Sequence, residues 1–182
     1  MNKKNIESIT QRWLKEVVID LNLCPFAQQE LQSGGVVFYV SEATEEIQLM
    51  QELEQQLKRL QVDDSIGTLL LIHPLIGISF DDYNQMLTMA DNLLEVMGLV
   101  GEFQIASFHP DYQFANTETN SPENYTNRSP FPMLHLLRES AVEKAIAHFE
   151  DIDKVPEKNI QTMNNLGYAE LQNKLSAIQS EQ

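Results

Sequence analysis

The sequence has few positive charges, and this scarcity limits the partners that the protein can attract. Its 182 residues contain 12 lysines and arginines against 27 acidic residues, which gives a formal net charge of −15 at pH 7. Nucleic acids and anionic membrane surfaces attract proteins through a positive field, which this balance does not supply. We therefore expect no nucleic-acid partner and no membrane partner.

Cysteine and long apolar runs are also scarce, and both absences bear on the compartment. The one cysteine, Cys24, cannot form a disulfide within the chain, which suits a reducing compartment. Lys3 and Lys4 are not followed by the apolar run of a signal peptide, and no run approaches the roughly 20 apolar residues that span a bilayer. These features predict a cytoplasmic protein.

Short apolar runs separated by helical patterns predict one α/β domain over residues 1–182, with a tail that frays from about residue 179. Three runs rich in β-branched or aromatic residues predict strands, namely Val36–Val40, Thr68–Ile72 and Phe103–Phe108. Apolar residues at helical spacing predict helices on either side of these strands. The first expected helix runs from about Lys4 to about Asp20. Further helices are expected after the caps Thr44, Ser79 and Ser140, from Pro156, and over Leu171–Ile178.

The order of these elements predicts a small, mainly parallel sheet. Two strand–helix–strand units in succession give three parallel strands, because such crossovers are right-handed. The segment Met133–Arg138 has two interpretations, a fourth strand antiparallel to the third or the start of a helix. A capping box at Ser140–Glu143 favours the strand, since it places the helix start after Arg138.

Two histidines occupy matching positions in this pattern. His73 and His109 each directly follow a predicted parallel strand, and each precedes a proline. The carboxyl ends of parallel strands lie at one edge of a sheet, where ligands of open α/β sheets bind. We therefore expect both imidazoles at the same edge, as candidate catalytic groups. The alternative is that each is a hydrogen-bonded structural histidine.

The connection from Pro110 to Pro132 is long and lacks apolar periodicity. Loops of this length in a compact domain are functional or disordered. Its aromatic residues favour an ordered loop, because disordered segments have little to bury. These residues are Tyr112, Phe114, Tyr125 and Phe131.

Arg128 is the main candidate for holding an anionic ligand, because its rigid fork of donors suits a carboxylate or phosphate. If the fourth strand is antiparallel, Arg128 and its neighbours Asn127 and Ser129 return to the edge that holds the two histidines. Cys24 is a candidate nucleophile there. The alternatives are a structural tie for the arginine and an inert packed thiol for the cysteine.

His135 and Arg138 are further candidates for ligand binding, and their arrangement depends on the uncertain segment. Residues three apart face opposite sides of a strand but share one face of a helix. No phosphate-loop, dinucleotide-binding, metalloprotease or nucleophile-elbow motif is present in the sequence. No spacing predicts a metal site, and no cofactor is indicated.

These residues support two functional hypotheses. In the first, the protein is an enzyme for a small anionic metabolite: His109 is the general acid or base, His73 orients His109 or the substrate, and Arg128, with Arg138, holds the anion. In the second, it is a non-catalytic regulatory domain whose 110–132 loop binds a ligand or partner protein. The aromatic anchors would then include Tyr112.

Three segments resemble a known family: L-N-L-C-P-F-A (21–27), S-F-H-P-D-Y-Q-F-A (107–115) and N-Y-T-N-R-S-P-F-P-M-L-H-L-L-R-E (124–139). Together they are similar to the bacterial family catalogued as domain of unknown function 1415, over roughly Ile6 to Leu175. The resemblance implies a small bacterial cytoplasmic protein. It implies no activity, cofactor or catalytic residue.

Overall fold

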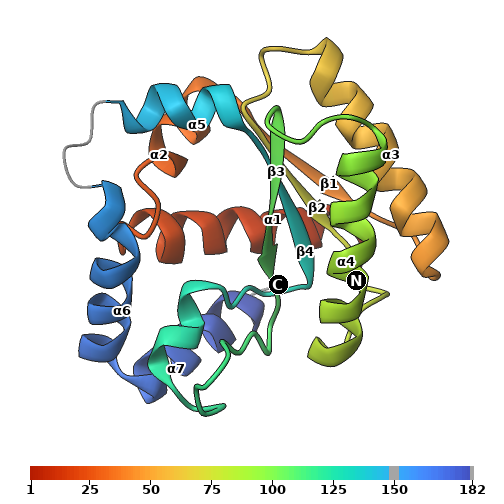
Figure 1. Cartoon of the computed structure of the whole chain (residues 1–182). Coiled ribbons are helices and arrows are strands. Elements are labelled where there is room, and N and C mark those ends of the chain that lie inside the picture. The colour runs from red at the N-terminus through yellow and green to blue at the C-terminus, as the bar shows by residue number, and fades with distance from the viewer. Residues whose placement is uncertain (148–151, 181–182) are drawn as a thin grey trace.

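Four strands form one sheet in the order β1-β2-β4-β3 (Figure 1). The computed structural model describes residues 1–147 and 152–180. The strands are β1 (Val36–Val40), β2 (Thr68–Ile72), β3 (Phe103–Phe108) and β4 (Met133–Arg138). The three ranges expected to be strands are confirmed, and the ambiguous segment is a strand rather than the start of a helix.

The sheet is mixed, so the expectation of a mainly parallel sheet is not met. β1 pairs in parallel with β2, but β4 lies between β2 and β3 and is antiparallel to both. Three strands therefore run in the same direction, yet only one pair of neighbours is parallel. The sheet is mixed because the 110–132 connection stays at the edge where β3 ends. The chain therefore re-enters the sheet in the opposite direction, as β4, between β2 and β3.

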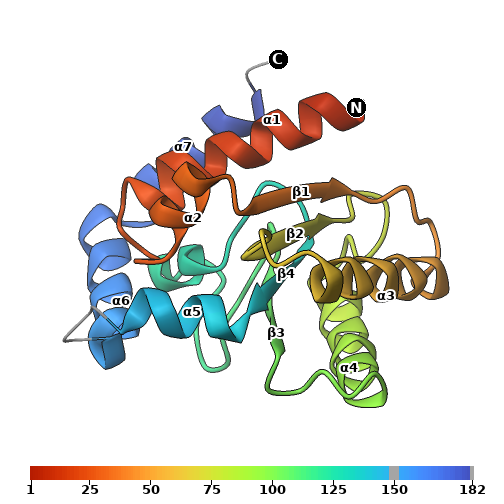
Figure 2. The same cartoon turned by 90° about the horizontal axis from the view of Figure 1, so that it is seen from above.

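Helices α3 (Glu46–Val62) and α4 (Phe80–Val96) cover one face of the sheet, while α1 (Lys3–Trp13) and the C-terminal helices cover the other (Figure 2). On β2, Leu69 and Leu71 pack under α3 and α4, whereas Leu70 and Ile72 belong to the second core. Side chains alternate between the faces of a strand. Burial on both faces therefore explains why this strand is continuously apolar.

The first predicted helix changes character part-way along. After Trp13 the segment Leu14–Ile19 is a π-helix, in which the Asp20 N–H donates to the Lys15 carbonyl at 2.9 Å. The later helices are α5 (Glu139–Ile146), α6 (Val155–Leu166) and α7 (Tyr168–Ser180), with 3₁₀ turns at Pro122–Thr126 and Ile152–Lys154. None of the helices among residues 1–147 and 152–180 is long and apolar enough to cross a membrane.

Some helix boundaries differ from the expected ones. Ser79 caps α4 by accepting the Asp82 N–H, as predicted, but Thr44 does not cap α3, which begins at Glu46. α5 begins at Glu139, one residue before the expected cap. The short helix α2 (Ala27–Ser33) was not anticipated. The tail expected to fray from about residue 179 is helical through Ser180, and residues 181–182 lie outside the described part.

Candidate functional site

His73 and His109 lie at the same edge of the sheet, as the sequence predicted. They follow β2 and β3, whose last residues both pair with Met133 of β4, one from each side. Between the two imidazoles lies Tyr83 of α4, with ring centroids 5.8 Å from His73 and 5.1 Å from His109. The Tyr83 hydroxyl donates to the Met133 carbonyl at 2.9 Å and accepts the Phe108 N–H at 3.0 Å. α4 is thereby fixed to the ends of β3 and β4.

Both ring nitrogens of His109 are occupied by backbone groups. Nδ1 accepts the Asp111 N–H at 3.0 Å, so Nε2 carries the proton and donates it to the Gly77 carbonyl, also at 3.0 Å. The residue is fully buried, and this burial lowers the pKa of its imidazole. No ring nitrogen remains for a substrate, so the contacts favour the structural interpretation of His109.

His73 is equally buried but incompletely satisfied. Its Nδ1–H donates to the Ile76 carbonyl at 2.9 Å, whereas Nε2 is buried without a partner among the residues described. Burial lowers the pKa of this imidazole to about 4, so the ring is neutral at pH 7. An acceptor sealed inside the core costs about 1–3 kcal/mol of stability and is out of a ligand's reach.

Arg128 uses its guanidinium to hold the long loop. It is 6% exposed, and its Nε and Nη2 donate to the carbonyls of Tyr112 at 3.1 Å and Thr119 at 2.8 Å. The guanidinium carbon lies 4.7 Å from the centroid of the Tyr125 ring. The Arg128 carbonyl accepts the indole N–H of Trp13 at 3.1 Å. These contacts correspond to the structural tie that the sequence left open.

Asn124 also holds the loop together through hydrogen bonds, although no sequence pattern marks it as a site residue. It is fully buried, and its Oδ1 accepts from the Phe114 N–H at 3.0 Å and the Thr117 hydroxyl at 2.9 Å. Its Nδ2 donates to the Glu118 carbonyl at 2.8 Å. A buried backbone needs such partners wherever no helix or strand supplies them.

Three other predicted ligand-binding residues serve the same segment. Asn127 donates its amide to the Ser107 carbonyl at 3.0 Å, and the Ser129 hydroxyl donates to the Phe131 carbonyl at 2.7 Å. The Tyr112 ring packs against Phe114, with centroids 4.9 Å apart. The loop is therefore ordered and packed by its own aromatic residues, as expected.

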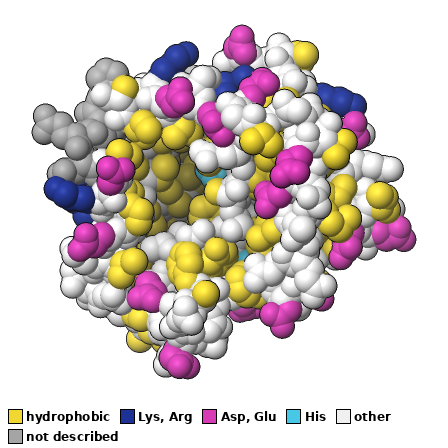
Figure 3. Space-filling view, viewed as in Figure 1, with side chains coloured by type: hydrophobic (Ala, Val, Ile, Leu, Met, Phe, Trp, Pro, Cys, Tyr) yellow, Lys and Arg dark blue, Asp and Glu magenta, His cyan; other side chains and the backbone are white. Residues whose placement is uncertain are grey.

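Cys24 and His135 lie elsewhere, on the walls of a cavity on the α1 face of the sheet. We call its inner part the inner chamber, with a volume of about 190 Å³, and its wider part the outer chamber, of about 520 Å³. The two adjoin at Val18, Cys24 and Phe108, which line both. Figure 3 shows a hollow with hydrophobic walls and a histidine inside it. The inner chamber is lined by Trp13, Leu14, Val18, Cys24, Phe26, Ala27, Val36, Thr68, Leu70, Ala106, Phe108, His135 and Leu137.

His135 presents a lone pair to the inner chamber. Because the Leu136 carbonyl can only accept, we assign the proton of the Thr68 hydroxyl, 2.9 Å away, to it; this assignment places a proton on His135 Nε2 in its 2.5 Å contact with Thr68 Oγ1. Nδ1 is then unprotonated; none of the hydrogen bonds of His135 to the described residues uses it, and because the side chain is half-buried rather than sealed, Nδ1 is open to the chamber. Burial lowers the pKa of this imidazole to about 4, so Nδ1 is an acceptor at pH 7.

Cys24 is a neutral thiol at this site. Burial raises its pKa, while the backbone N–H groups of Phe26 and Ala27 act in the opposite direction. A nucleophilic cysteine needs its pKa lowered, so the raised value favours a packed thiol. Within residues 1–147 and 152–180, no group of three His, Cys, Asp or Glu side chains is arranged to hold a metal ion.

The chambers thus bring together only part of the predicted site. Cys24 and Asn127 line the outer chamber, and Cys24 and His135 line the inner one, but neither lining includes His73, His109 or Arg128. The alternation along β4 could have placed His135 on the α1 face, opposite Leu134 and Leu136. Nothing in the sequence marks the chamber itself, which is formed by elements far apart in the chain.

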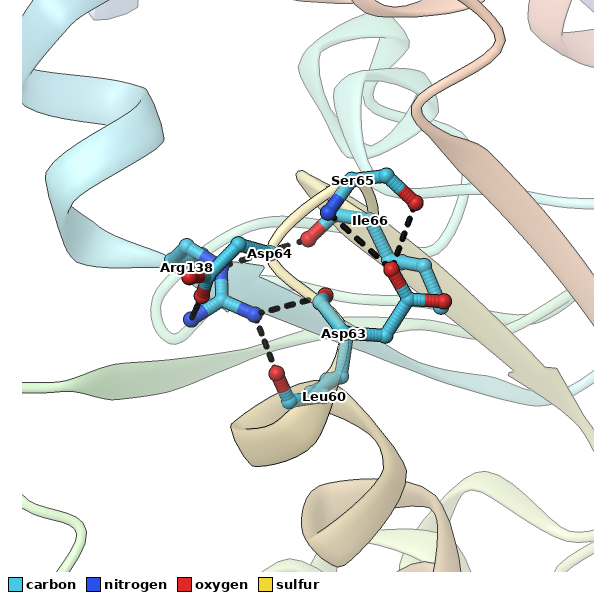
Figure 4. Close-up of polar contacts among 6 residues, drawn as sticks. All are labelled: Leu60, Asp63, Asp64, Ser65, Ile66 and Arg138. Carbon is cyan, nitrogen blue, oxygen red and sulfur yellow. Dashed lines mark hydrogen bonds and ion pairs between the residues drawn. The ribbon is translucent and has the colours of Figure 1, made fainter.

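Arg138 lies at the opposite end of β4 from the two edge histidines. Its guanidinium donates to the carbonyls of Ile66, Leu60 and Asp63, as Figure 4 shows. It therefore points toward the end of α3, on the face away from His135. Like Arg128, it satisfies backbone carbonyls and lines neither chamber.

Replacing Arg128 with alanine tests whether it is a tie or a ligand-holding group. We expect the free energy of unfolding to fall by about 2–3 kcal/mol, because two charge-assisted hydrogen bonds from the buried guanidinium to the partly buried loop carbonyls are lost. The Arg128→Lys variant should lose less stability than Arg128→Ala, because a lysine can still make part of the hydrogen bonding of the guanidinium. Urea unfolding measures both. Unchanged stability together with lost anion binding would instead identify an anion site.

Comparison with protein families gives a match over most of the chain. Residues 5–173 match a family model described as protein of unknown function (DUF1415), which covers nearly the whole chain. No curated protein and no solved structure matches the chain.

Proposed function

Since the chain belongs to the DUF1415 family, whose description assigns no activity, we propose from the geometry that it binds a small, mainly apolar molecule in the inner and outer chambers. The observation behind this proposal is the unpartnered Nδ1 of His135 within an otherwise apolar wall. His135 is half-buried, so this atom is open to the chamber and can accept a hydrogen bond from a ligand. A few polar groups placed in a mainly apolar wall are what fix the orientation of a bound small molecule.

The size and composition of the cavity support the same proposal. Small-molecule sites are concave, mainly apolar, roughly 300–1,000 Å³ in volume, and carry a few polar groups that fix orientation. The outer chamber has a volume of about 520 Å³ and combines apolar walls with amide and hydroxyl groups. Those polar groups come from Thr117, Thr126, Asn127 and Asn159, with the carboxyl of Glu123.

The 110–132 loop takes part as a wall of the outer chamber. Six of its residues line that chamber: Phe114, Ala115, Thr117, Glu123, Thr126 and Asn127. Arg128 and Asn124 hold this wall in place through the loop carbonyls and amides. The proposal is thus a form of the non-catalytic hypothesis, with the ligand beneath the loop rather than on its aromatic surface.

Catalysis on an anionic metabolite has less support. It requires a histidine nitrogen and an arginine fork that are both open to a substrate. His109 has both nitrogens occupied, and Arg128 donates to the carbonyls of its own loop. The inner chamber, whose lining among the described residues includes no lysine, arginine, aspartate or glutamate, supports recognition of an uncharged group.

A filled chamber provides the test. Ala106 lines the inner chamber from β3, so Ala106→Phe should fill part of it and reduce binding of inner-chamber ligands at least tenfold. Val96→Phe is the matched control, because Val96 is 85% exposed on α4, on the other face of the sheet. A library of small apolar compounds would be screened by ligand-observed NMR against all three proteins. The proposal fails if no compound binds the wild type more tightly than Ala106→Phe.

A further inference from the structure

We infer that the ligand of the inner chamber is an uncharged one- or two-ring aromatic compound with a single O–H or N–H donor, of the phenol or indole class, which donates to His135 Nδ1. This inference rests on the proposed function and names the class of ligand. Four features of the inner chamber lead to it: its charge, its hydrogen-bond polarity, its other polar groups and its walls.

The first feature is the absence of charge. Among the residues described, the lining of the inner chamber includes no lysine, arginine, aspartate or glutamate. An ionised ligand would lose its hydration there without gaining a partner of opposite charge. The net charge of −15 adds a further penalty for anions. A neutral ligand is therefore favoured over a carboxylate or phosphate of the same size.

The second feature is a fixed direction of hydrogen bonding. The relay runs from His135 Nε2–H to Thr68 Oγ1 and from the Thr68 hydroxyl to the Leu136 carbonyl. With the hydroxyl proton assigned to the carbonyl, which can only accept, both protons of this relay are used and Nδ1 is left as an acceptor. A ligand with a donor can hydrogen-bond to Nδ1, whereas a ligand that has only an acceptor is repelled by the lone pair of Nδ1. Burial keeps the imidazole neutral at pH 7, with its pKa lowered to about 4.

The third feature is that the other polar groups of the wall are already occupied. The Trp13 indole N–H donates to the Arg128 carbonyl at 3.1 Å, and the Thr68 hydroxyl belongs to the relay. The Cys24 thiol is neutral, because burial raises its pKa, and a thiol is only a weak hydrogen-bonding group. Nδ1 is therefore the one strong polar contact that the described wall offers, which matches a ligand with one donor.

The fourth feature is the shape and lining of the chamber. Trp13, Phe26 and Phe108 supply aromatic surface, and the rings of Trp13 and Phe108 meet edge to face with centroids 5.3 Å apart. A flat ring can pack against such walls in the offset or edge-on arrangements that aromatic pairs prefer. An apolar cavity of about 150 Å³ is known to admit benzene. A chamber of about 190 Å³ thus suits a small ring compound.

Matched probes test the inference in the wild-type protein. Phenol carries the donor, anisole replaces it with an acceptor, toluene has neither, and benzoate is charged. We expect phenol to bind at least about threefold more tightly than toluene or anisole, because one hydrogen bond to an open acceptor is gained. Benzoate should bind more weakly than toluene. Titrations followed by NMR should also show the ¹⁵N resonance of His135 Nδ1 shifting with phenol and not with toluene.

Thr68→Val reverses the polarity of the relay. The variant removes the acceptor of the His135 Nε2–H, so the imidazole can carry its proton on Nδ1 and offer a donor to the chamber. We expect the preference for phenol over anisole to fall at least about threefold. His135→Leu, which removes the lone pair, should bind phenol and toluene equally. If either variant fails to fold, the wild-type affinities and the Nδ1 resonance decide the question alone.

The outcomes separate this inference from the proposed function. Equal affinities for phenol, toluene and anisole would overturn the donor-based inference, while binding that Ala106→Phe abolishes would still support a ligand chamber. Stronger binding of benzoate than of phenol would overturn it as well. If no probe binds the wild type, the inference fails whatever the library screen finds. Three results together support both the inference and the proposed function. They are a preference for phenol, the loss of this preference in the variants, and the shift of the His135 Nδ1 resonance.

Discussion

Replacing Arg138 with alanine should lower the free energy of unfolding by about 3–4 kcal/mol. The side chain is 9% exposed, and its Nε donates to the Ile66 carbonyl at 3.3 Å. Its Nη2 donates to the Leu60 carbonyl and, at 3.2 Å, to the Asp63 carbonyl, as drawn in Figure 4. The guanidinium also lies 5.0 Å from the centroid of the Phe103 ring. Alanine would remove all of these contacts at once.

The size of the expected effect follows from the position of these carbonyls. Leu60 belongs to the last turn of α3, whose final carbonyls have no partner within the helix and carry its negative partial charge. A buried cation that binds them satisfies the helix end and links α3 to β4. The contact of Nη1 with the Asp64 carboxylate, at 3.5 Å, adds little, because that side chain is 95% exposed and screened by water.

Two comparisons separate this role from a general effect of charge. Arg59→Ala removes an exposed arginine from the same end of α3 and should change stability by less than about 0.5 kcal/mol. Asp64→Asn should have a similarly small effect. Urea unfolding, followed through the fluorescence of Trp13, measures all three variants. A loss for Arg138→Ala as small as that for Arg59→Ala would show that the carbonyl contacts contribute little.

The strands were predictable because their signal is local. Thr68–Ile72 is buried on both faces and is apolar at almost every position, and Ser79 shows the cap of α4 directly in the sequence. The place of β4 between β2 and β3 was not predictable. Its pattern indicates a strand but does not identify its neighbours, because pairing depends on contacts between segments far apart in the chain.

The site was predictable only in part, because residue type does not show which groups satisfy a side chain. Arg128 stands out in a chain with few cations, yet its donors are used by carbonyls of the long loop that lie outside any helix or strand. His109 stands out at a strand end, yet backbone groups on both sides occupy its ring. The chamber depends on volume that no side chain fills, and volume leaves no pattern in a sequence.

Stability should also fall steeply as the pH drops from 7 to 5.5, because two imidazoles resist protonation in the fold. Burial lowers the pKa of His73 and of His135 to about 4, from an ordinary value of 6.5. Above pH 6.5 neither the folded nor the unfolded chain protonates them, and their contribution to stability is complete. Below pH 6.5 these two histidines bind protons in the unfolded chain but not in the folded one. Stability is therefore lost as the pH falls toward about 4.

The expected size of this effect is large enough to measure. Each such histidine changes stability by up to about 1.4 kcal/mol per pH unit within the window, so together they should remove about 2–3 kcal/mol between pH 7 and 5.5. His109, whose pKa burial also lowers, acts in the same direction. Carboxyl groups in model peptides have pKa values of about 4, below this range. Urea unfolding at pH 7.0, 6.5, 6.0 and 5.5 gives the profile.

Two substitutions assign the slope to particular rings. His73→Asn can keep a donor near the Ile76 carbonyl, and His135→Gln can keep one near Thr68, but neither side chain titrates. Each variant should therefore lose less stability than the wild type between pH 7 and 5.5, by about 1 kcal/mol. Asp63→Asn is the control, because hydrogen bonds from Ser65 lower the pKa of that carboxyl and its titration falls below this range. If the wild-type profile is flat, or if all three variants keep its slope, the buried imidazoles are not the source of the acid sensitivity.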